Sequence, residues 1–259
     1  MKKCVGVLKM FNLIHADFYR NVHGKTYKVC ILLTIIWVLL CSYAQTAAIN
    51  VREVITGTDA AIDYWNSFFN YYPVVFPLMI FCSYFAANDF KQGTIKNYIS
   101  RGISRKSYFF SKLLIGWFAS ITFLSVAFIT GYFCNKVFFG GGFFSCPVGN
   151  VVSYFLCQLL FHCSVATLGI AITFFIRNST ISTIVNLSLV FFGYLCIHGI
   201  ESILGLGYRI SIFWALSNIS KTRIEQAPQW IFTAIIVFIG YAIILGIISN
   251  ISLHKKDIA

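Results

Sequence analysis

Six basic residues and a single acid lie close together in the polar stretch 88–112, which reads DFKQGTIKNYISRGISRKSYFFSK from residue 89. The acid is Asp89, and the bases are Lys91, Lys96, Arg101, Arg105, Lys106 and Lys112. Long apolar runs flank the stretch on both sides. Because an excess of lysine and arginine between apolar runs is typical of the cytoplasmic side of a membrane, we expect a cytoplasmic loop here.

The pattern inside this loop predicts a short helix with one apolar face. Gly93 provides a turn, Thr94 can cap a helix start, and Ile95, Tyr98 and Ile99 follow at helical spacing before Gly102. A simple connector needs no apolar face, whereas a surface that docks on a soluble partner does. The residues expected to form this docking site are Asp89, Gly93, Thr94, Ile95, Lys96, Tyr98, Ile99, Arg101 and Arg105.

The apolar runs offer few groups for ion coupling or metal binding. None of the predicted spans carries Asp, Glu, Lys or Arg between its ends, although ion-coupled carriers usually keep such a group despite a cost of roughly 2.5–3.5 kcal/mol. His162 and His198 are titratable, but a lone histidine in a span is more often an interhelical hydrogen-bonding residue than a proton relay. Cys157 and Cys163 lie about 240° apart around a helix, so they do not converge with His162 on a metal.

Signatures of hydrolysis and nucleotide binding are missing from the sequence. It contains no HExxH, GxSxG or paired-carboxylate motif near the spans, no GxxxxGK[ST] phosphate loop and no CxxC spacing among its nine cysteines. We therefore expect a chain that is not itself an enzyme and that uses no cofactor, metal or nucleic-acid partner. Whatever energy the chain uses must come from elsewhere.

Composition points to a membrane. The 259 residues are 58% hydrophobic and 11% charged, with a mean hydropathy of +0.79, which excludes an ordinary soluble domain. We expect an all-α integral membrane protein with one transmembrane domain over residues 29–259. Its six predicted spans are 29–49, 71–87, 113–134, 151–176, 181–200 and 230–249. Pro73 and Pro77 predict a kink near the outer end of the second.

The segments outside the spans carry their own patterns. In residues 1–28, apolar side chains recur at helical spacing with polar ones between them, which predicts an interfacial amphipathic helix; a plain basic leader is the alternative. The apolar set is Val7, Phe11, Ile14, Phe18 and Val22, and the polar set is Lys9, Asn12, Asp17, Arg20 and Asn21. Residues 201–229 hold a run too short to span, which predicts broken, re-entrant helices or, almost equally, a surface loop.

Charge predicts the topology. Fifteen of the 20 lysines and arginines fall on the side that holds both termini and the loop 88–112, and five fall on the other side. We therefore expect both termini in the cytoplasm of a multi-pass protein of the plasma membrane.

These features together resemble the permease subunits of type-2 ABC transporters, over nearly the whole chain and most sharply over residues 89–114. Asp89 matches an acidic position where Glu is commoner in that family. Gly93, Thr94, Ile95 and Lys96 match the start of the family's coupling helix. Ser104, Arg105, Tyr108 and Lys112 match the segment leading back into the membrane, with Ile103 in place of the usual Pro.

The resemblance implies a coupling helix seated in a groove of a separate ATPase subunit, with two ATPase copies and a second permease unit that is identical or different. It also implies re-entrant helices between the fifth and sixth spans. Small permeases of this length are similar to bacterial exporters of, or immunity proteins against, antimicrobial peptides. We expect export of an amphipathic or hydrophobic cargo. A non-transporting membrane scaffold or sensor and an ion-independent facilitator are the alternatives.

Overall fold

The computed structural model describes residues 2–56, 60–100, 102–140, 147–205 and 210–255, and these form helices without a strand among them. This confirms the all-α class. The α-helices are α1 Lys2–His23, α2 Lys25–Thr56, α3 Ala60–Ser67, α4 Val75–Lys91, α5 Thr94–Ser100, α6 Arg105–Phe139, α7 Val148–Ile176, α8 Ser179–Leu204, α9 Ala215–Lys221 and α10 Ala227–Lys255. Two 3-10 turns, η1 Phe68–Tyr71 and η3 Ser211–Phe213, lie between them.

Six segments are long and apolar enough to cross a membrane, and each predicted span overlaps one of them. They are Lys25–Thr46, Ala60–Lys91, Arg105–Phe139, Val148–Ile176, Ser179–Leu204 and Ala227–Ser249. About 20 apolar residues suffice to cross a hydrocarbon core of about 30 Å. Most of the helices run past the predicted bounds, because polar residues continue the same helix beyond its apolar part.

The second predicted span is broken rather than kinked. The chain leaves the helical path between η1 and α4, where Tyr72 adopts a φ of +50° and Pro73 follows. Pro77 lies in the first turn of α4, where its missing N–H costs no intrahelical hydrogen bond. Pro73 therefore marks the break, and Pro77 is accommodated within α4.

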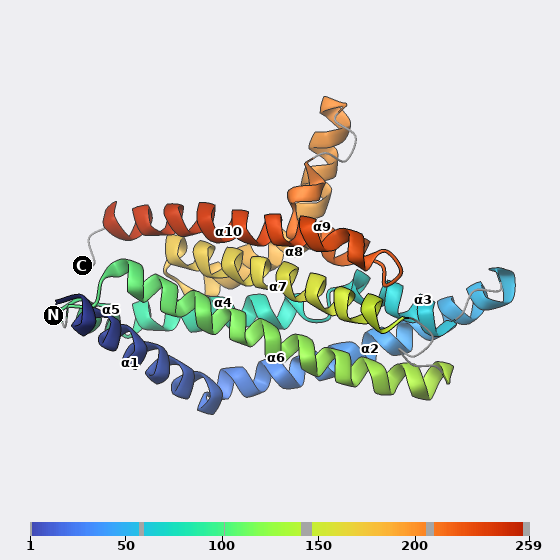
Figure 1. The fold of residues 1–259 in the computed structure, drawn as a ribbon, viewed down its shortest axis with the longest axis horizontal. Coiled ribbons are helices and arrows are strands. Elements are labelled where there is room, and N and C mark those ends of the chain that lie inside the picture. The colour runs from blue at the N-terminus through green and yellow to red at the C-terminus, as the bar shows by residue number, and fades with distance from the viewer. Residues whose placement is uncertain (1, 57–59, 101, 141–146, 206–209, 256–259) are drawn as a thin grey trace.

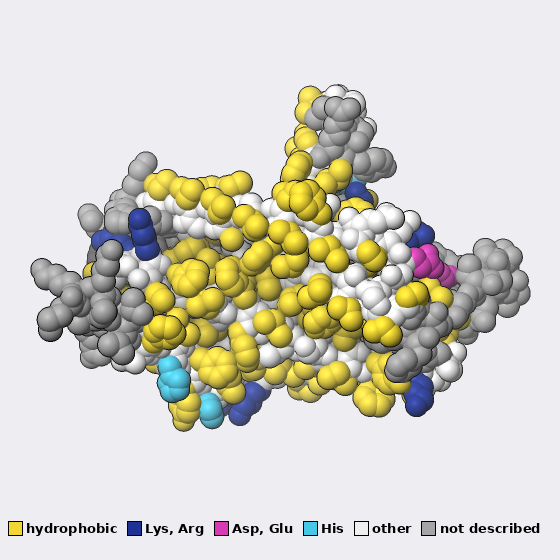
Figure 2. Space-filling model, viewed as in Figure 1, with side chains coloured by type: hydrophobic (Ala, Val, Ile, Leu, Met, Phe, Trp, Pro, Cys, Tyr) yellow, Lys and Arg dark blue, Asp and Glu magenta, His cyan; other side chains and the backbone are white. Residues whose placement is uncertain are grey.

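Most of the long helices run side by side, with α7 packed against α4, α6, α8 and α10, while the orange end of α8 projects from the bundle (Figure 1). Both chain ends and α5 lie at one end of this bundle, and α3 lies at the other. Figure 2 shows hydrophobic side chains covering the middle of one face, with most of the visible charges toward its two ends. This distribution suits a bundle whose middle faces lipid.

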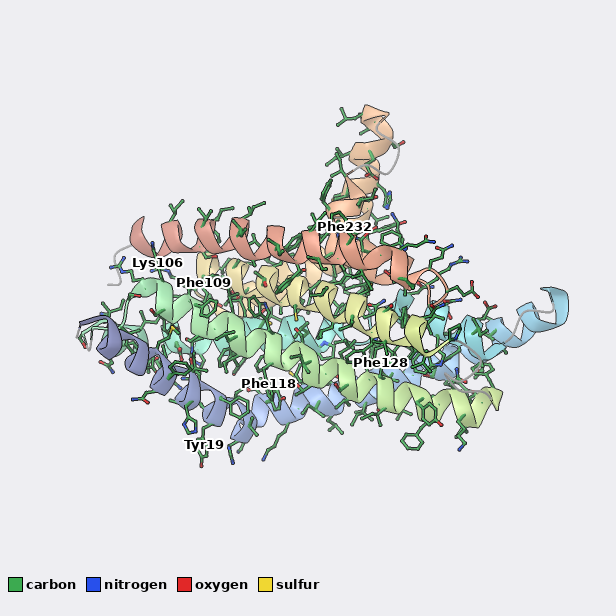
Figure 3. The ribbon with its side chains drawn as sticks, viewed as in Figure 1. Tyr19, Lys106, Phe109, Phe118, Phe128 and Phe232 are labelled. Atoms are coloured by element: carbon green, nitrogen blue, oxygen red, sulfur yellow. The ribbon has the colours of Figure 1, made fainter. Side chains whose placement is uncertain are left out.

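Small residues allow close helix crossings. A Cβ built on Gly116 of α6 would lie 2.5 Å from Cδ1 of Ile170 on α7, and one built on Gly169 would lie 2.8 Å from the Met79 sulfur on α4. Toward the other end the core is aromatic, with the ring of Phe128, labelled in Figure 3, stacked on that of Trp65 at 5.6 Å between centroids. Close backbone approach and ring packing hold the helices together where polar contacts are few.

The segment predicted over 201–229 is divided among several elements. Its first residues belong to α8 and its last to α10, while η3 and α9 lie between, and residues 206–209 lie outside the described part of the chain. Helix α9 is buried, and the carbonyl of Ile219 on it accepts a hydrogen bond from Gln158 of α7 at 3.0 Å. The segment therefore contains the short elements η3 and α9, and α9 is part of the core rather than a surface loop.

Helix α1 runs obliquely beside α6 and presents an unexpected face to it (Figure 1). The side chains buried there are Leu13, Asp17 and Asn21, whereas Phe11 and Tyr19 are exposed, and Tyr19 points away from the bundle in Figure 3. The predicted apolar stripe thus faces partly outward, as an interfacial helix requires. The side chains of Val7 and Lys9 lie outside the described residues.

We predict that the end of the bundle holding α5 is cytoplasmic. The test adds single cysteines at two exposed positions, Asn97→Cys on α5 and Lys136→Cys near the far end of α6, in a background where the native Cys4, Cys146 and Cys196 are replaced by Ala. The six other cysteines are buried. A membrane-impermeant thiol reagent on intact cells should label Lys136→Cys at once and Asn97→Cys only after permeabilisation. The reverse pattern would invert the topology.

Candidate functional site

Helix α5 begins at Thr94, as the sequence predicted, directly after a turn that only glycine adopts readily. Gly93 has a φ of +64°, and a Cβ built on it would meet no atom within 4 Å. Glycine is therefore needed for its backbone conformation and not for space. The Thr94 hydroxyl donates a hydrogen bond to the Asp89 carbonyl at 3.3 Å, which ties the start of α5 to the end of α4.

The apolar face of α5 packs on the chain itself. Ile95 is 2% exposed, and Tyr98 and Ile99 are half-buried, with the Tyr98 ring 5.8 Å from that of Tyr108. This corrects the expectation of an open apolar docking face, because burial of such a side chain stabilises α5 against its own bundle by about 1.5–3 kcal/mol. The outward surface of α5 is polar.

Three exposed polar side chains, Lys96, Asn97 and Ser100, form this outward surface, and we call them the α5 outer face. Two other predicted site residues lie beyond it. Arg101 is outside the described residues, and Arg105, half-buried, is the first residue of α6. Ser104 precedes it and caps α6, since its hydroxyl accepts a hydrogen bond from the Ser107 N–H at 3.1 Å.

Asp89 is fully buried, and three other side chains surround its carboxylate. Lys112 Nζ lies 2.6 Å from Oδ2, and the Tyr108 hydroxyl donates to the same oxygen at 2.8 Å. Arg20 Nη1 donates to Oδ1 at 2.7 Å. The prediction that Asp89 is a loop residue is therefore wrong. Asp89 is a buried ion-pairing residue in the last turn of α4.

Asp17 of α1 completes the arrangement. Lys112 Nζ lies 2.9 Å and 2.8 Å from its two carboxylate oxygens, and Arg20 Nη2 donates to Oδ1 at 3.1 Å. The Ser111 hydroxyl makes a longer contact of 3.4 Å with Oδ2. We call Asp17, Arg20, Asp89 and Lys112 the ion cluster.

The ion cluster is balanced in charge and closed to solvent on most sides. Asp17, Asp89 and Lys112 are at most 1% exposed, and only Arg20 reaches the surface. Burial alone would lower the pKa of Arg20, but its hydrogen bond to Asp89 and the nearby charges of Asp89 and Asp17 raise that pKa above its ordinary value. Lys112 also lies 4.6 Å from the centre of the Phe85 ring, a favourable cation–π contact.

The ion cluster joins α1, α4 and α6 beside α5, and the sequence indicates only part of it. The resemblance singled out Asp89, Tyr108 and Lys112, and the structure brings them together. Asp17 and Arg20 were assigned to a separate interfacial helix. A usable signal was the scarcity of acids, because a lone carboxylate in a strongly basic stretch is a natural ion-pair partner.

The predicted spans carry no charges within their own bounds, but the helices that contain them carry charges beyond those bounds. Asp89 lies inside α4 and Lys112 inside α6, because both helices extend past their predicted ends. Glu201 likewise belongs to α8, where it accepts a hydrogen bond from the Ser211 N–H and pairs with His198 at 3.1 Å. These charges are tolerated near helix ends, where they are paired.

The two histidines have separate structural partners. His162 is fully buried in α7, its Nδ1 lies 2.7 Å from the carbonyl of Gln158, and its ring packs on Phe69. His198 is the Glu201 partner on α8. Among the described residues no group of three or more His, Cys, Asp or Glu side chains could hold a metal ion.

We predict that Lys112→Met destabilises the protein by about 3–5 kcal/mol, because it leaves two buried carboxylates beside a single arginine. Adding Asp17→Asn should recover most of this loss, since Asp89 and Arg20 then balance. Thermal unfolding in detergent measures both proteins. Lys106→Met, an exposed site on the same helix, is the control and should change stability by less than about 0.5 kcal/mol. Equal losses from Lys112→Met and Lys106→Met would contradict a stabilising ion cluster.

Comparison with known sequences gives one family. Residues 25–259 match the family described as a protein of unknown function, DUF2705. No curated protein matches the chain. The match starts at the first residue of α2, so it includes Asp89 and Lys112 of the ion cluster but not α1. Because it spans most of the sequence, the chain belongs to the DUF2705 family.

Proposed function

We propose that this protein is a multi-pass membrane protein, with both termini in the cytoplasm, that serves as the permease subunit of an ATP-driven ABC exporter in a bacterial cell membrane. The observation that carries the proposal is α5, a short helix with a polar outer face between two long apolar helices. It lies at the same end of the bundle as both termini (Figure 1). A helix so placed suits the docking of a cytoplasmic ATPase.

The ion cluster supports this role because it gives α5 a firm connection to the spans. Thr94 holds the start of α5 to Asp89, and Asp89 is paired with both Lys112 of α6 and Arg20 of α1. A force on α5 therefore reaches three long helices through short polar contacts. Rigid helices linked by such contacts are the kind of network through which one site affects another.

The burial of Ile95 changes how the docking surface is composed. The ATPase groove receives the α5 outer face together with the half-buried edges of Tyr98 and Ile99, while Ile95 anchors α5 to the bundle. Surface ion pairs contribute only about 0–1 kcal/mol each, so Lys96 guides and orients the partner more than it holds it. The working assembly contains two ATPase copies and a second permease unit, and it moves an amphipathic or hydrophobic cargo outward.

A second candidate, a membrane scaffold or sensor without transport, is favoured by the same burial of Ile95. If α5 exists only to close the inner end of the bundle, its apolar face would pack as it does and its outer face would simply be solvated. The two functions differ in whether the α5 outer face binds an ATPase.

We predict that the purified chain alone neither binds nor hydrolyses ATP, because the sequence holds no phosphate-binding loop. It should co-purify with an ABC ATPase, sought first in the neighbouring reading frame. Nucleotide binding is measured by equilibrium dialysis and hydrolysis by phosphate release. Hydrolysis in a preparation shown by mass spectrometry to contain only this chain would rule out the subunit assignment.

We predict that Lys96→Glu with Ser100→Glu, two changes one turn apart on the α5 outer face, lowers recovery of the tagged ATPase by about tenfold or more, equivalent to about 1.4 kcal/mol. The membrane level of the chain should not change, because both side chains are in water. Pull-down at matched expression is the measurement.

The control for this pair introduces two glutamates at exposed sites on the opposite end of the bundle, Lys136→Glu with Gln226→Glu. These should leave ATPase recovery unchanged. Retention of the ATPase by the α5 pair at the control level would make α5 a connector and put the scaffold function first. Ile95→Asp is not a clean test, since it disrupts the packing of α5 itself.

A further inference from the structure

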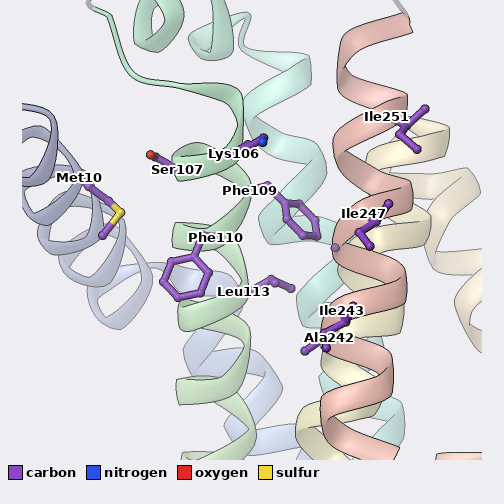
Figure 4. Close-up of a pocket in the computed structure, with 11 residues that line it drawn as sticks. Met10, Lys106, Ser107, Phe109, Phe110, Leu113, Ala242, Ile243, Ile247 and Ile251 are labelled. Carbon is purple, nitrogen blue, oxygen red and sulfur yellow. The ribbon is translucent and has the colours of Figure 1, made fainter. Parts of the chain in front are cut away.

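A groove of about 600 Å³ runs between α6 and α10 at the end of the bundle that holds the chain termini. Figure 4 shows Phe109 and Ile247 facing one another across it, with Lys106 at one end and Leu113 and Ile243 toward the other. Met10 of α1 and Phe110 border it on the α1 side. The groove is separate from the ion cluster and from the α5 outer face.

The dimensions of the groove suit one leaflet of a bilayer. From Lys106 to Leu113 the chain rises about 10 Å along α6, and from Ala242 to Ile251 about 14 Å along α10. Half of a typical hydrocarbon core is about 15 Å. The volume also falls within the range of about 300–1,000 Å³ that is usual for sites of small ligands.

The lining is apolar along its length and positively charged at one end. Phe110, Ile243 and Ile247 are 43%, 56% and 57% exposed, so the groove is open along its side. Lys106 stands exposed at the first turn of α6, where the helix dipole adds positive potential. None of the described lining residues is acidic, and none of the described carboxylates forms an ion pair with Lys106.

We propose that this groove binds an anionic phospholipid of the cytoplasmic leaflet, with one acyl chain between α6 and α10 and the phosphate on Lys106. A single positively charged end and an apolar length of one leaflet match an anionic phospholipid in both charge and length. The inference rests on the proposed membrane topology and not on an ATPase partner. A wrong topology would be revealed independently by the cysteine labelling.

A glycine in the groove provides a direct test. Gly246 lines it, and a Cβ built there would meet nothing within 4 Å, so Gly246→Phe fills the groove without displacing the fold. Gly240, on the same helix and equally open around its Cβ, lies outside the lining, and Gly240→Phe is the matched control. For the charged end, Lys106→Gln is compared with Lys91→Gln, an exposed lysine away from the groove.

The experiment incubates the full-length protein in detergent with phosphatidylglycerol or phosphatidylcholine of identical chains and counts bound lipids by native mass spectrometry. The wild type should prefer phosphatidylglycerol by about fivefold, as one lysine near a phosphate predicts. Gly246→Phe should lower retention of both lipids by about tenfold, while Gly240→Phe retains them. Lys106→Gln should abolish the preference but keep acyl-chain binding, and Lys91→Gln should behave as wild type.

Three results would overturn the inference. Equal retention by Gly246→Phe and Gly240→Phe would show that lipid binds elsewhere. Equal binding of the two lipids by the wild type would remove the headgroup site at Lys106. A loss of dimer in Gly246→Phe without a loss of lipid would make the groove an interface between two copies of the chain.

Discussion

The arrangement of the end of the bundle that holds α5 depends on one interaction, the pairing of two carboxylates with two cations inside the ion cluster. Burying one of these charges alone would cost several kcal/mol, so each of Asp17, Asp89 and Lys112 requires the others. The requirement fixes geometry as well as charge, because Lys112 must reach carboxylates on two different helices. The ion pairs of Lys112 with Asp17 and Asp89 therefore hold α1, α4 and α6 together at this end.

Helix α5 shows how one short element serves two surfaces. Its apolar side, centred on Ile95, is used to hold it against the bundle, and its outer side presents Lys96 and Asn97 to water. In the coupling role proposed for α5, inward packing and an outward polar face complement one another. A partner bound to the outer face can move the spans only if α5 is itself fixed to them. The positive φ of Gly93 turns the chain so that Ile95 faces the bundle and Lys96 faces water.

The polar end that holds α5 contrasts with the opposite end, where aromatic packing replaces ion pairing. The rings of Trp65 and Phe128 stack there, and α9 is buried against α7 and η1. Such contacts hold helices together without the directional demands of a charge cluster. The end that holds α3 is thus held together by dispersion and close packing, and the end that holds α5 by electrostatics, which suits the proposed docking of an ATPase at α5.

The sequence by itself determined the helical class, the six apolar segments and the start of α5, because apolar runs, Gly93 and the spacing of Ile95, Tyr98 and Ile99 are local signals. It also pointed to Asp89 and Lys112 through a local motif. Only the tertiary structure decided that Asp17 and Arg20 join them, that Ile95 faces inward and that Phe109 and Ile247 border one groove. Those outcomes depend on contacts between residues 69 to 95 positions apart and between helices that are distant in the chain. The periodicity within one segment shows which side chains share a face, but it carries no information about which neighbouring helix that face will contact.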